Sequence, residues 1–286
     1  MSSNVTAQDA VLPKYTELKH PVTGEAILYP YTFQQSALTS ALSYQAQPTD
    51  IFVGSFAKSG TTWLQHIVWL IIHHGEDHPT DRPMSQCIPQ LDFDGKEGCE
   101  AVDNSRYPRI IKTHFVYDWT PYNPAAKYLY IARNPKDVLV SYYYHLLGFA
   151  KYYDCAGLQL NDLYKLFVEG KVECGRDYFR HVSEWYEKRN EQNVLFLVYE
   201  DLKSDITKEV LKVAEFLGPQ YKEELLRDNG RSLQNILEKV SLSSMKRGKD
   251  TKWVKFLCIH LSKIKLGNAV DSSYNGLPRD QQNRPS

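Results

Sequence analysis

The chemistry that this sequence can perform is clearest in residues 56–63, which read FAKSGTTW. An apolar run at 51–55 precedes them, and a helical pattern at 64–70 follows them. A loop between a strand and a helix can bind a phosphate group, because its backbone N–H groups and the positive end of the helix both point at the anion. The sequence therefore predicts a phosphate site with the members Lys58, Ser59, Gly60, Thr61 and Thr62.

The order of residues in this loop separates it from the nucleoside-triphosphate loop G-x-x-x-x-G-K-[ST]. In that loop the lysine follows the second glycine, whereas here Lys58 stands two residues before Gly60 and threonines follow the glycine. Lys58 is therefore expected on the loop itself and not at the start of the helix. A phosphate-loop nucleotide kinase is an alternative, but it predicts Mg²⁺ dependence and a G-K-[ST] order that this loop lacks.

Residues 112–114, Lys-Thr-His, close a short predicted strand. The reference pKa of histidine is about 6.5, so His114 can take a proton from a reacting group near neutral pH. Lys112 lies two residues earlier and therefore points to the same side of the strand. The pair predicts a general base with a neighbouring cation. Packing or surface positions are expected for five other histidines: His20, His66, His73, His74 and His145.

Four short apolar runs are predicted as strands, at 51–55, 109–113, 127–132 and 194–198. Three helical patterns follow these strands. The first begins near Gly60, and the second runs from Lys136 to about Phe149, directly after Pro135. The third lies between Tyr199 and about Leu217 and is closed by Gly218 and Pro219. Strands that alternate with helices predict an α/β fold, with a central parallel sheet flanked by helices. Ligands bind beyond the carboxyl ends of such strands. Residues 55–60, 112–114, Arg133 and Tyr199 all fall there.

Composition narrows the class of protein and of partner. The chain has 286 residues, of which 42% are hydrophobic, so a single α/β domain over 1–286 is expected. Lys and Arg together number 34, as do Asp and Glu, so nucleic acid and anionic membranes are not expected as partners. The five cysteines form no C-x-x-C motif and are expected as free thiols. The polar segment 1–14 and the shortness of the apolar helix at 63–72 predict a cytoplasmic protein.

Residues 56–63 resemble the Y-P-K-S-G-T-T-W loop of the cytosolic sulfotransferases. Three later segments, at 111–114, at 130–138 with 141–143, and at 198–202, follow in the order and spacing of that family. The resemblance runs from about Lys14 to Met245. It implies transfer of a sulfonate group from 3'-phosphoadenosine 5'-phosphosulfate (PAPS) to the hydroxyl or amine of a small acceptor, expected to be a phenol or phenolic amine. The nucleotide product would be PAP, and no metal is required.

The resemblance also implies a role for individual residues. Lys58 would contact the 5'-phosphate and the bridging oxygen, the loop residues 59–62 would surround that phosphate, and Lys112 would lie near the sulfonate beside the base His114. The residues implied for the remainder of the nucleotide are Trp63 and Tyr199 at the adenine, Arg133 and Ser141 at the 3'-phosphate, and Val240, Ser241, Leu242 and Met245 along the nucleotide.

Plainer roles remain open for some of these residues. Lys112 could be a solvated lysine at the end of a strand, Arg133 could pair with Asp137, and Tyr199 could belong to the core. Tyr142, Tyr143, Tyr144 and Phe149 are candidates for the wall of an aromatic acceptor pocket.

The sequence departs from the family pattern in two places. Ala57 replaces the proline before the lysine, which costs some rigidity of the loop. The family motif R-K-G-x-x-G-D-W-K, which closes over the 3'-phosphate, is absent, and 246–286 form an atypical C-terminal segment whose last residues are expected to be disordered. A relative that binds PAPS or PAP but is catalytically impaired is therefore an alternative. The dimerisation segment is also unrecognisable, so the sequence leaves monomer and homodimer open.

Overall fold

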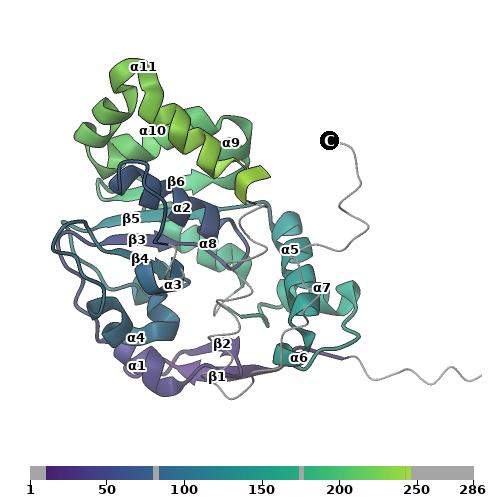
Figure 1. The fold of residues 1–286 in the computed structure, drawn as a ribbon. Helices are drawn as coiled ribbons and strands as arrows, with labels where there is room; N and C mark the ends of the chain where they lie inside the picture. Colours follow the sequence, from purple (N-terminus) through teal and green to yellow (C-terminus); the bar gives the residue numbers. More distant parts are fainter. Residues whose placement is uncertain (1–10, 80–83, 174–176, 242, 246–286) are drawn as a thin grey trace, which may run out of the picture.

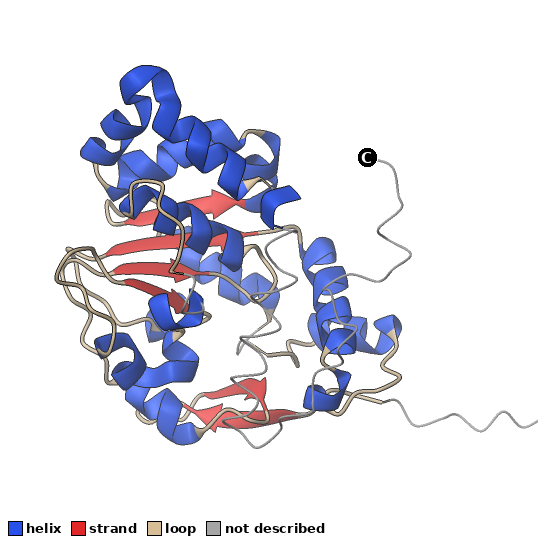
Figure 2. Cartoon of the chain, viewed as in Figure 1, coloured by secondary structure: helices blue, strands red, loops and turns tan. Residues whose placement is uncertain are grey.

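The computed structural model describes residues 11–79, 84–173, 177–241 and 243–245. At its centre is a parallel four-stranded sheet with the strand order β4-β3-β5-β6 (Figures 1 and 2). The strands are β3 (Ile51–Gly54), β4 (Ile110–Thr113), β5 (Lys127–Ala132) and β6 (Val194–Val198). The prediction of an α/β fold with a central parallel sheet is therefore confirmed. The predicted runs match β5 and β6, and they exceed β3 and β4 by one residue each.

One face of the sheet is covered by three helices, α2 (Thr61–Ile72), α10 (Ile206–Leu217) and α11 (Pro219–Val240). Successive residues of a strand point to opposite faces. Ile51, Val53 and Leu129 belong to the cluster on this side, together with the apolar residues of α2. Because α2 packs between the sheet and α11, its N-terminal end is held at the edge where β3 ends.

The opposite face carries larger side chains. Phe52, Tyr128 and Tyr130 pack in a second cluster with residues of α1 (Gln35–Leu42), α4 (Leu91–Glu100) and α8 (Tyr178–Glu187). Both faces of the sheet are thus buried, which accounts for strands that read as nearly continuous apolar runs. A separate antiparallel pair, β1 (Tyr15–Lys19) and β2 (Ala26–Pro30), lies near α1 and α4 (Figure 1).

A third cluster faces the carboxyl ends of the sheet strands. It is built by α5 (Pro135–Gly148), α6 (Ala150–Tyr153) and α7 (Leu160–Val168), which stand together at the end toward which the strand arrows point (Figure 2). Phe56 and Ala57, from the loop after β3, pack into this cluster. The short elements are α3 (Met84–Cys87), the 3-10 helix η1 (Tyr117–Trp119) and α9 (Tyr199–Ser204).

The helix predicted between Tyr199 and about Leu217 is two helices in the structure. The chain leaves the helical conformation at Asp205 (φ −143°, ψ 82°), and the Asp205 side chain accepts a hydrogen bond from the Lys208 N–H at the start of α10. A cap residue with an extended backbone starts a new helix instead of continuing the old one. Gly218 and Pro219 end α10, as predicted, but Pro219 also begins α11.

Within the described part of the chain, no helix has both the length and the apolar character needed to cross a membrane. Nor do the described residues bring three or more His, Cys, Asp or Glu side chains together in a group that could hold a metal ion.

Candidate active site

The loop between β3 and α2 turns sharply through backbone conformations of positive φ. Lys58 has φ 68° and Gly60 has φ 109°, so the chain reverses around Ser59 before α2 begins at Thr61. A hydrogen bond of 2.5 Å between the hydroxyl groups of Ser55 and Thr61 closes the base of the loop. The Thr61 hydroxyl is therefore already engaged, and the loop is held in shape by its own side chains.

The inside of this loop has the character of an anion site. The Ser59 side chain is fully buried, and its Oγ has no hydrogen-bond partner among the described residues. A buried hydroxyl without a partner costs free energy, so an acceptor from outside the chain would stabilise it. The N–H groups of Thr61 and Thr62 start α2, where the helix offers them no acceptor. The Ser59 hydroxyl, the two N–H groups and the helix dipole therefore all favour an anion at this point.

Arg133 lies directly beside this loop. Its Nη1 donates to the Lys58 carbonyl oxygen over 3.3 Å, and its guanidinium lies over the Tyr199 ring at 4.4 Å from the centroid. The Arg133 Nε is buried and has no hydrogen-bond partner among the described residues. The Tyr199 ring meets the Trp63 ring edge to face at 5.4 Å. Arg133, Tyr199 and Trp63 therefore form one cluster with Lys58. They come from the end of β5, the end of β6 and the start of α2.

The end of α11 reaches the same cluster. The Trp63 Nε1 donates to the Val240 carbonyl oxygen over 2.8 Å, and the Met245 N–H donates to the Ser241 carbonyl oxygen over 2.9 Å. Met245 packs against the core on the α2 side of the sheet. Leu242 and the segment 246–286, for which the sequence also made predictions, lie outside the described residues.

Ser141 stands on α5, and no hydrogen bond among the described residues joins it to Arg133. The structure therefore does not pair these two predicted 3'-phosphate contacts directly. They remain on neighbouring elements, Arg133 at the end of β5 and Ser141 on the helix that follows.

His114 is nearly buried and fixed in orientation. Its Nδ1 donates to the Ser55 carbonyl oxygen over 2.7 Å, because a carbonyl oxygen can only accept. The Nδ1 proton leaves the Nε2 of the neutral ring with a free lone pair, which is the atom able to take a proton. Burial, and then the charge of Lys112, holds the pKa of His114 well below its usual value. The imidazole is therefore neutral near pH 7, as a general base requires.

Lys112 and His114 are connected through two residues that the sequence analysis missed. The Lys112 Nζ donates to Gln90 Oε1 over 2.7 Å, and the Gln90 Nε2 donates to Asp92 Oδ2 over 2.8 Å. The other Asp92 oxygen, Oδ1, accepts from the His114 N–H over 3.2 Å. Burial raises the pKa of the Asp92 carboxyl. Both residues stand at the start of α4, and no local motif marks them.

Two more titratable residues near the site were not predicted to act there. His145, on α5, was expected at a packing or surface position; burial, and then the charges of Lys58 and Lys112, lower its pKa well below the usual value. Glu173 was not singled out, and burial raises its pKa to about 7. Charges on the loop and on β4 therefore act on the layer formed by α5, α6 and α7.

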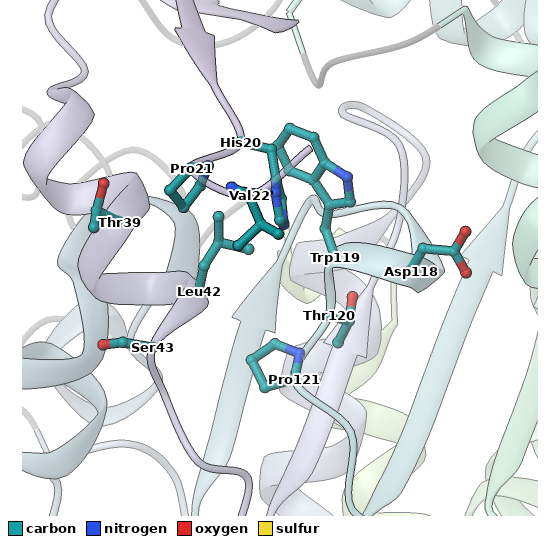
Figure 3. Close-up of a pocket in the computed structure, with 10 residues that line it drawn as sticks. All are labelled: His20, Pro21, Val22, Thr39, Leu42, Ser43, Asp118, Trp119, Thr120 and Pro121. Atoms are coloured by element: carbon teal, nitrogen blue, oxygen red, sulfur yellow. Dashed lines mark hydrogen bonds between the residues drawn. The ribbon is translucent and has the colours of Figure 1, made fainter. Parts of the chain in front are cut away.

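A surface pocket of about 350 Å³ lies elsewhere, between the β1–β2 turn, α1 and η1 (Figure 3). His20, Leu42 and Trp119 are among its lining residues, and the His20 and Trp119 rings are 4.8 Å apart. None of the residues that the sequence assigned to the phosphate loop, the base or the nucleotide lines it. This pocket is therefore separate from the candidate active site.

The chain is similar to known proteins both in sequence and in fold. Residues 48–262 match the model of the sulfotransferase domain. The chain is 34% identical to sulfotransferase 1A1 of Bos taurus over 224 residues, which cover 76% of this chain and 72% of that one. It is 34% identical to human sulfotransferase 1E1 over 218 residues, 74% of this chain and 71% of that one.

Two solved structures are similar in fold. One is a retinol dehydratase in complex with androsterone and the inactive cofactor PAP, with a TM-score of 0.66, 25% identity and coverage of 81% of this chain and 75% of that one. The other is mouse sulfotransferase SULT7A1 complexed with PAP, with a TM-score of 0.61, 29% identity and coverage of 80% and 76%. The domain match, the identity to curated relatives and the fold agree, and the chain belongs to the sulfotransferase family.

Proposed function

We propose that this protein transfers the sulfonate group of PAPS to the hydroxyl or amine of a small acceptor, a phenol or phenolic amine. The observation that carries the proposal is the fully buried Ser59 hydroxyl without a partner among the described residues, at the start of α2 and beside Lys58 and Arg133. It fits a phosphate oxygen. The presence of PAP in two solved relatives supports the same nucleotide here.

The described residues fit the two ends of such a nucleotide. Residues 59–62 would hold the 5'-phosphate with N–H and hydroxyl groups, and Arg133 would hold the 3'-phosphate, since its planar fork suits phosphate oxygens. Trp63 and Tyr199 would supply the aromatic surface for the adenine. Val240, which accepts a hydrogen bond from Trp63, and Ser241 and Met245, which follow it, would lie along the nucleotide.

PAPS would supply an activated sulfonate group together with a phosphate leaving group. The acceptor hydroxyl gives up its proton to Nε2 of His114, whose Nδ1 is held by Ser55. Lys58 stabilises the negative charge that develops on the bridging oxygen, and Lys112, anchored by Gln90, stabilises charge on the sulfonate. Positioning and electrostatic stabilisation would carry the rate, as in phosphoryl transfer.

The proposal is tested by transfer of radiolabelled sulfonate from PAPS to phenols, catecholamines, steroids and aliphatic alcohols, with and without Mg²⁺. We expect transfer to phenols that is unaffected by chelation of Mg²⁺. A silent panel in a protein that binds PAP tightly would support the catalytically impaired relative instead. Phosphate transfer from ATP that requires Mg²⁺ would support the kinase.

Replacing Arg133 with alanine is expected to weaken PAP binding about 10- to 100-fold, since a hydrogen bond to a charged group is worth roughly 1.5–3 kcal/mol. Calorimetric titration with PAP and with adenosine 5'-monophosphate, which lacks the 3'-phosphate, checks the assignment. Arg133→Ala should reduce the affinity for PAP much more than the affinity for the monophosphate. Equal losses of affinity for both nucleotides would mean that Arg133 does not bind the 3'-phosphate. Its role would then be to support the loop and the adenine surface through its contacts with Lys58 and Tyr199.

Gly60→Ala is expected to weaken PAP binding by about tenfold or more. The new Cβ would lie 2.7 Å from Cδ2 of Tyr199, and the backbone at φ 109° disfavours any residue with a Cβ. Gly157→Ala is the matched control, because Gly157 also has positive φ, 93°, but nothing lies within 4 Å of its added Cβ. Titration of both variants with PAP separates the displacement of Tyr199 from backbone strain alone. Equal affinities in the two variants would contradict this explanation.

A further inference from the structure

The chain before α4 is joined to β4 at Lys112. Gln90 has an extended backbone (φ −94°, ψ 107°) and pairs with Lys112 in an isolated parallel bridge. The Lys112 N–H donates to the Pro89 carbonyl oxygen over 2.8 Å. Residues paired in this way point their side chains to the same face, which explains why the Lys112 Nζ meets Gln90 Oε1 at 2.7 Å. The position of Gln90 is therefore set by the backbone, and only the direction of its amide remains to be fixed.

The direction of the Gln90 amide is fixed by its two partners. An ammonium group can only donate, and an ionised carboxylate can only accept. The Lys112 Nζ therefore requires the amide oxygen, and Asp92 Oδ2, which lies 2.8 Å from Gln90 Nε2, requires the amide nitrogen. Reversing the amide would place its nitrogen against the ammonium group. One orientation of the amide thus satisfies both neighbours.

The Asp92 carboxylate is buried and serves two donors. Asp92 is 1% exposed, and its Oδ1 accepts from the His114 N–H over 3.2 Å while Oδ2 accepts from Gln90. Burial raises the pKa of Asp92, whereas the Lys112 charge and the hydrogen bonds from Gln90 and His114 lower it. A buried carboxylate costs free energy unless positive charge and hydrogen bonds compensate it. The compensation passes through Gln90 to Lys112, so these three side chains form one network.

We infer that Asp92 is a positioning residue for the transfer. One of its oxygens sets the direction of the Gln90 amide, which in turn holds the Lys112 ammonium group at the sulfonate. The other oxygen holds the backbone of the base, His114. The inference rests on the proposed sulfonate transfer, and neither Asp92 nor Gln90 is assigned a contact with the reacting atoms. Their contribution is to restrict a long lysine side chain before negative charge develops, so that less entropy is lost when Lys112 stabilises that charge.

Asp92→Asn removes one acceptor with little change in the size of the side chain. The single asparagine oxygen can accept from only one of the two donors. The His114 N–H belongs to the backbone and cannot turn away, whereas the Gln90 amide can rotate. We therefore expect the asparagine oxygen to stay on His114 and the Gln90 amide to reverse. The amide nitrogen then faces the Lys112 ammonium group, which loses this anchor.

Single-turnover transfer to 4-ethylphenol tests the anchor. Asp92→Asn and Gln90→Met should each lower kcat by about tenfold, while the affinity for PAP changes by less than about threefold. Glu100→Gln is the matched control, because it removes one negative charge from α4 at an exposed residue that pairs with Lys96. Its kcat should equal that of wild type. A kcat for Asp92→Asn within about threefold of wild type overturns the inference.

A double-mutant cycle gives a readout that a merely structural role would not produce. Lys112→Met should lower kcat by about 10²-fold. Adding Asp92→Asn to that variant should cost less than about threefold more, because the group that Asp92 positions is already gone. A general distortion of the fold by Asp92→Asn would instead lower kcat by the same factor in both backgrounds. Such additivity overturns the inference.

A measurement without turnover separates this inference from the proposed function. Ammonium protons held by a hydrogen bond exchange slowly with water, so NMR of the protein with isotope-labelled lysine should show a Lys112 signal, assigned by its absence in Lys112→Met. The signal should persist in Glu100→Gln and disappear in Asp92→Asn and Gln90→Met. If wild type transfers no sulfonate but the signal behaves in this way, sulfonate transfer fails and the anchoring of Lys112 stands. If wild type transfers sulfonate and both variants keep the signal and the kcat, the function stands and the positioning role fails.

Discussion

Replacing His114 with alanine is expected to lower kcat for sulfonate transfer by about 10³-fold, within the 10²- to 10⁴-fold range of general acid–base catalysis. The affinity for PAP should change by less than about threefold, because the His114 ring contacts Ser55 and not the loop residues assigned to the phosphate. Single-turnover transfer to 4-ethylphenol and calorimetric titration with PAP measure the two quantities. Equal losses of both would refute the role of His114 as the base.

A second variant separates the chemistry of His114 from its structural role. In His114→Asn the side-chain amide can still donate to the Ser55 carbonyl oxygen, as Nδ1 does, but it has no basic Nε2. We expect this variant to unfold at a temperature near that of wild type and to be as inactive as His114→Ala. Substantial activity in the asparagine variant would mean that another group, or water, takes the proton.

The pH profile follows from the direction of the His114 shift. Because the pKa in the folded protein lies well below 6.5, the ring is already neutral at pH 6.5 and stays neutral above it. For 4-ethylphenol, which carries no amine, kcat/KM should therefore be flat from pH 6.5 to 8 and should fall only at lower pH. An acid limb centred above pH 6.5 would be inconsistent with this environment of His114.

Replacing Lys58 with methionine is expected to lower kcat by about 10²- to 10³-fold, the usual loss when one group that stabilises transition-state charge is removed. PAP binding should also weaken, since Lys58 is assigned to the 5'-phosphate as well as to the bridging oxygen. Lys203 is an exposed lysine of α9, so Lys203→Met is the control for the loss of one positive charge. Single-turnover transfer and PAP titration of both variants check the prediction.

The two measurements separate the two roles assigned to Lys58. A loss of PAP affinity without a loss of kcat would assign Lys58 to the 5'-phosphate alone. An unchanged kcat would remove Lys58 from the reaction.

Local sequence was sufficient for the sheet and for the residues at the ends of its strands. An apolar run followed by a polar or charged group marks where a buried strand emerges, so the loop after β3, the Lys112–His114 pair and Arg133 could be placed at one edge from sequence alone. The parallel pairing of β3 with β4 and β5 then makes these positions neighbours. Pro135 likewise marked the start of α5 in the sequence.

Local sequence was insufficient where a contact depends on how separate helices pack. Gln90 and Asp92 reach Lys112 and His114 only because α4 lies against the sheet. No motif in the sequence around them predicts these contacts. The break at Asp205 was missed because the helical pattern continues through it.

The sequence by itself determined the family and the parallel sheet and singled out candidate residues for the site, because motifs and apolar periodicity are local properties of the chain. Only the tertiary structure decided the electrostatic state of those residues. The burial of His114, and its proximity to the charges of His181 and Lys58, arise from segments distant in the chain. Desolvation and charge proximity depend on distances in space, which spacing along the chain does not specify.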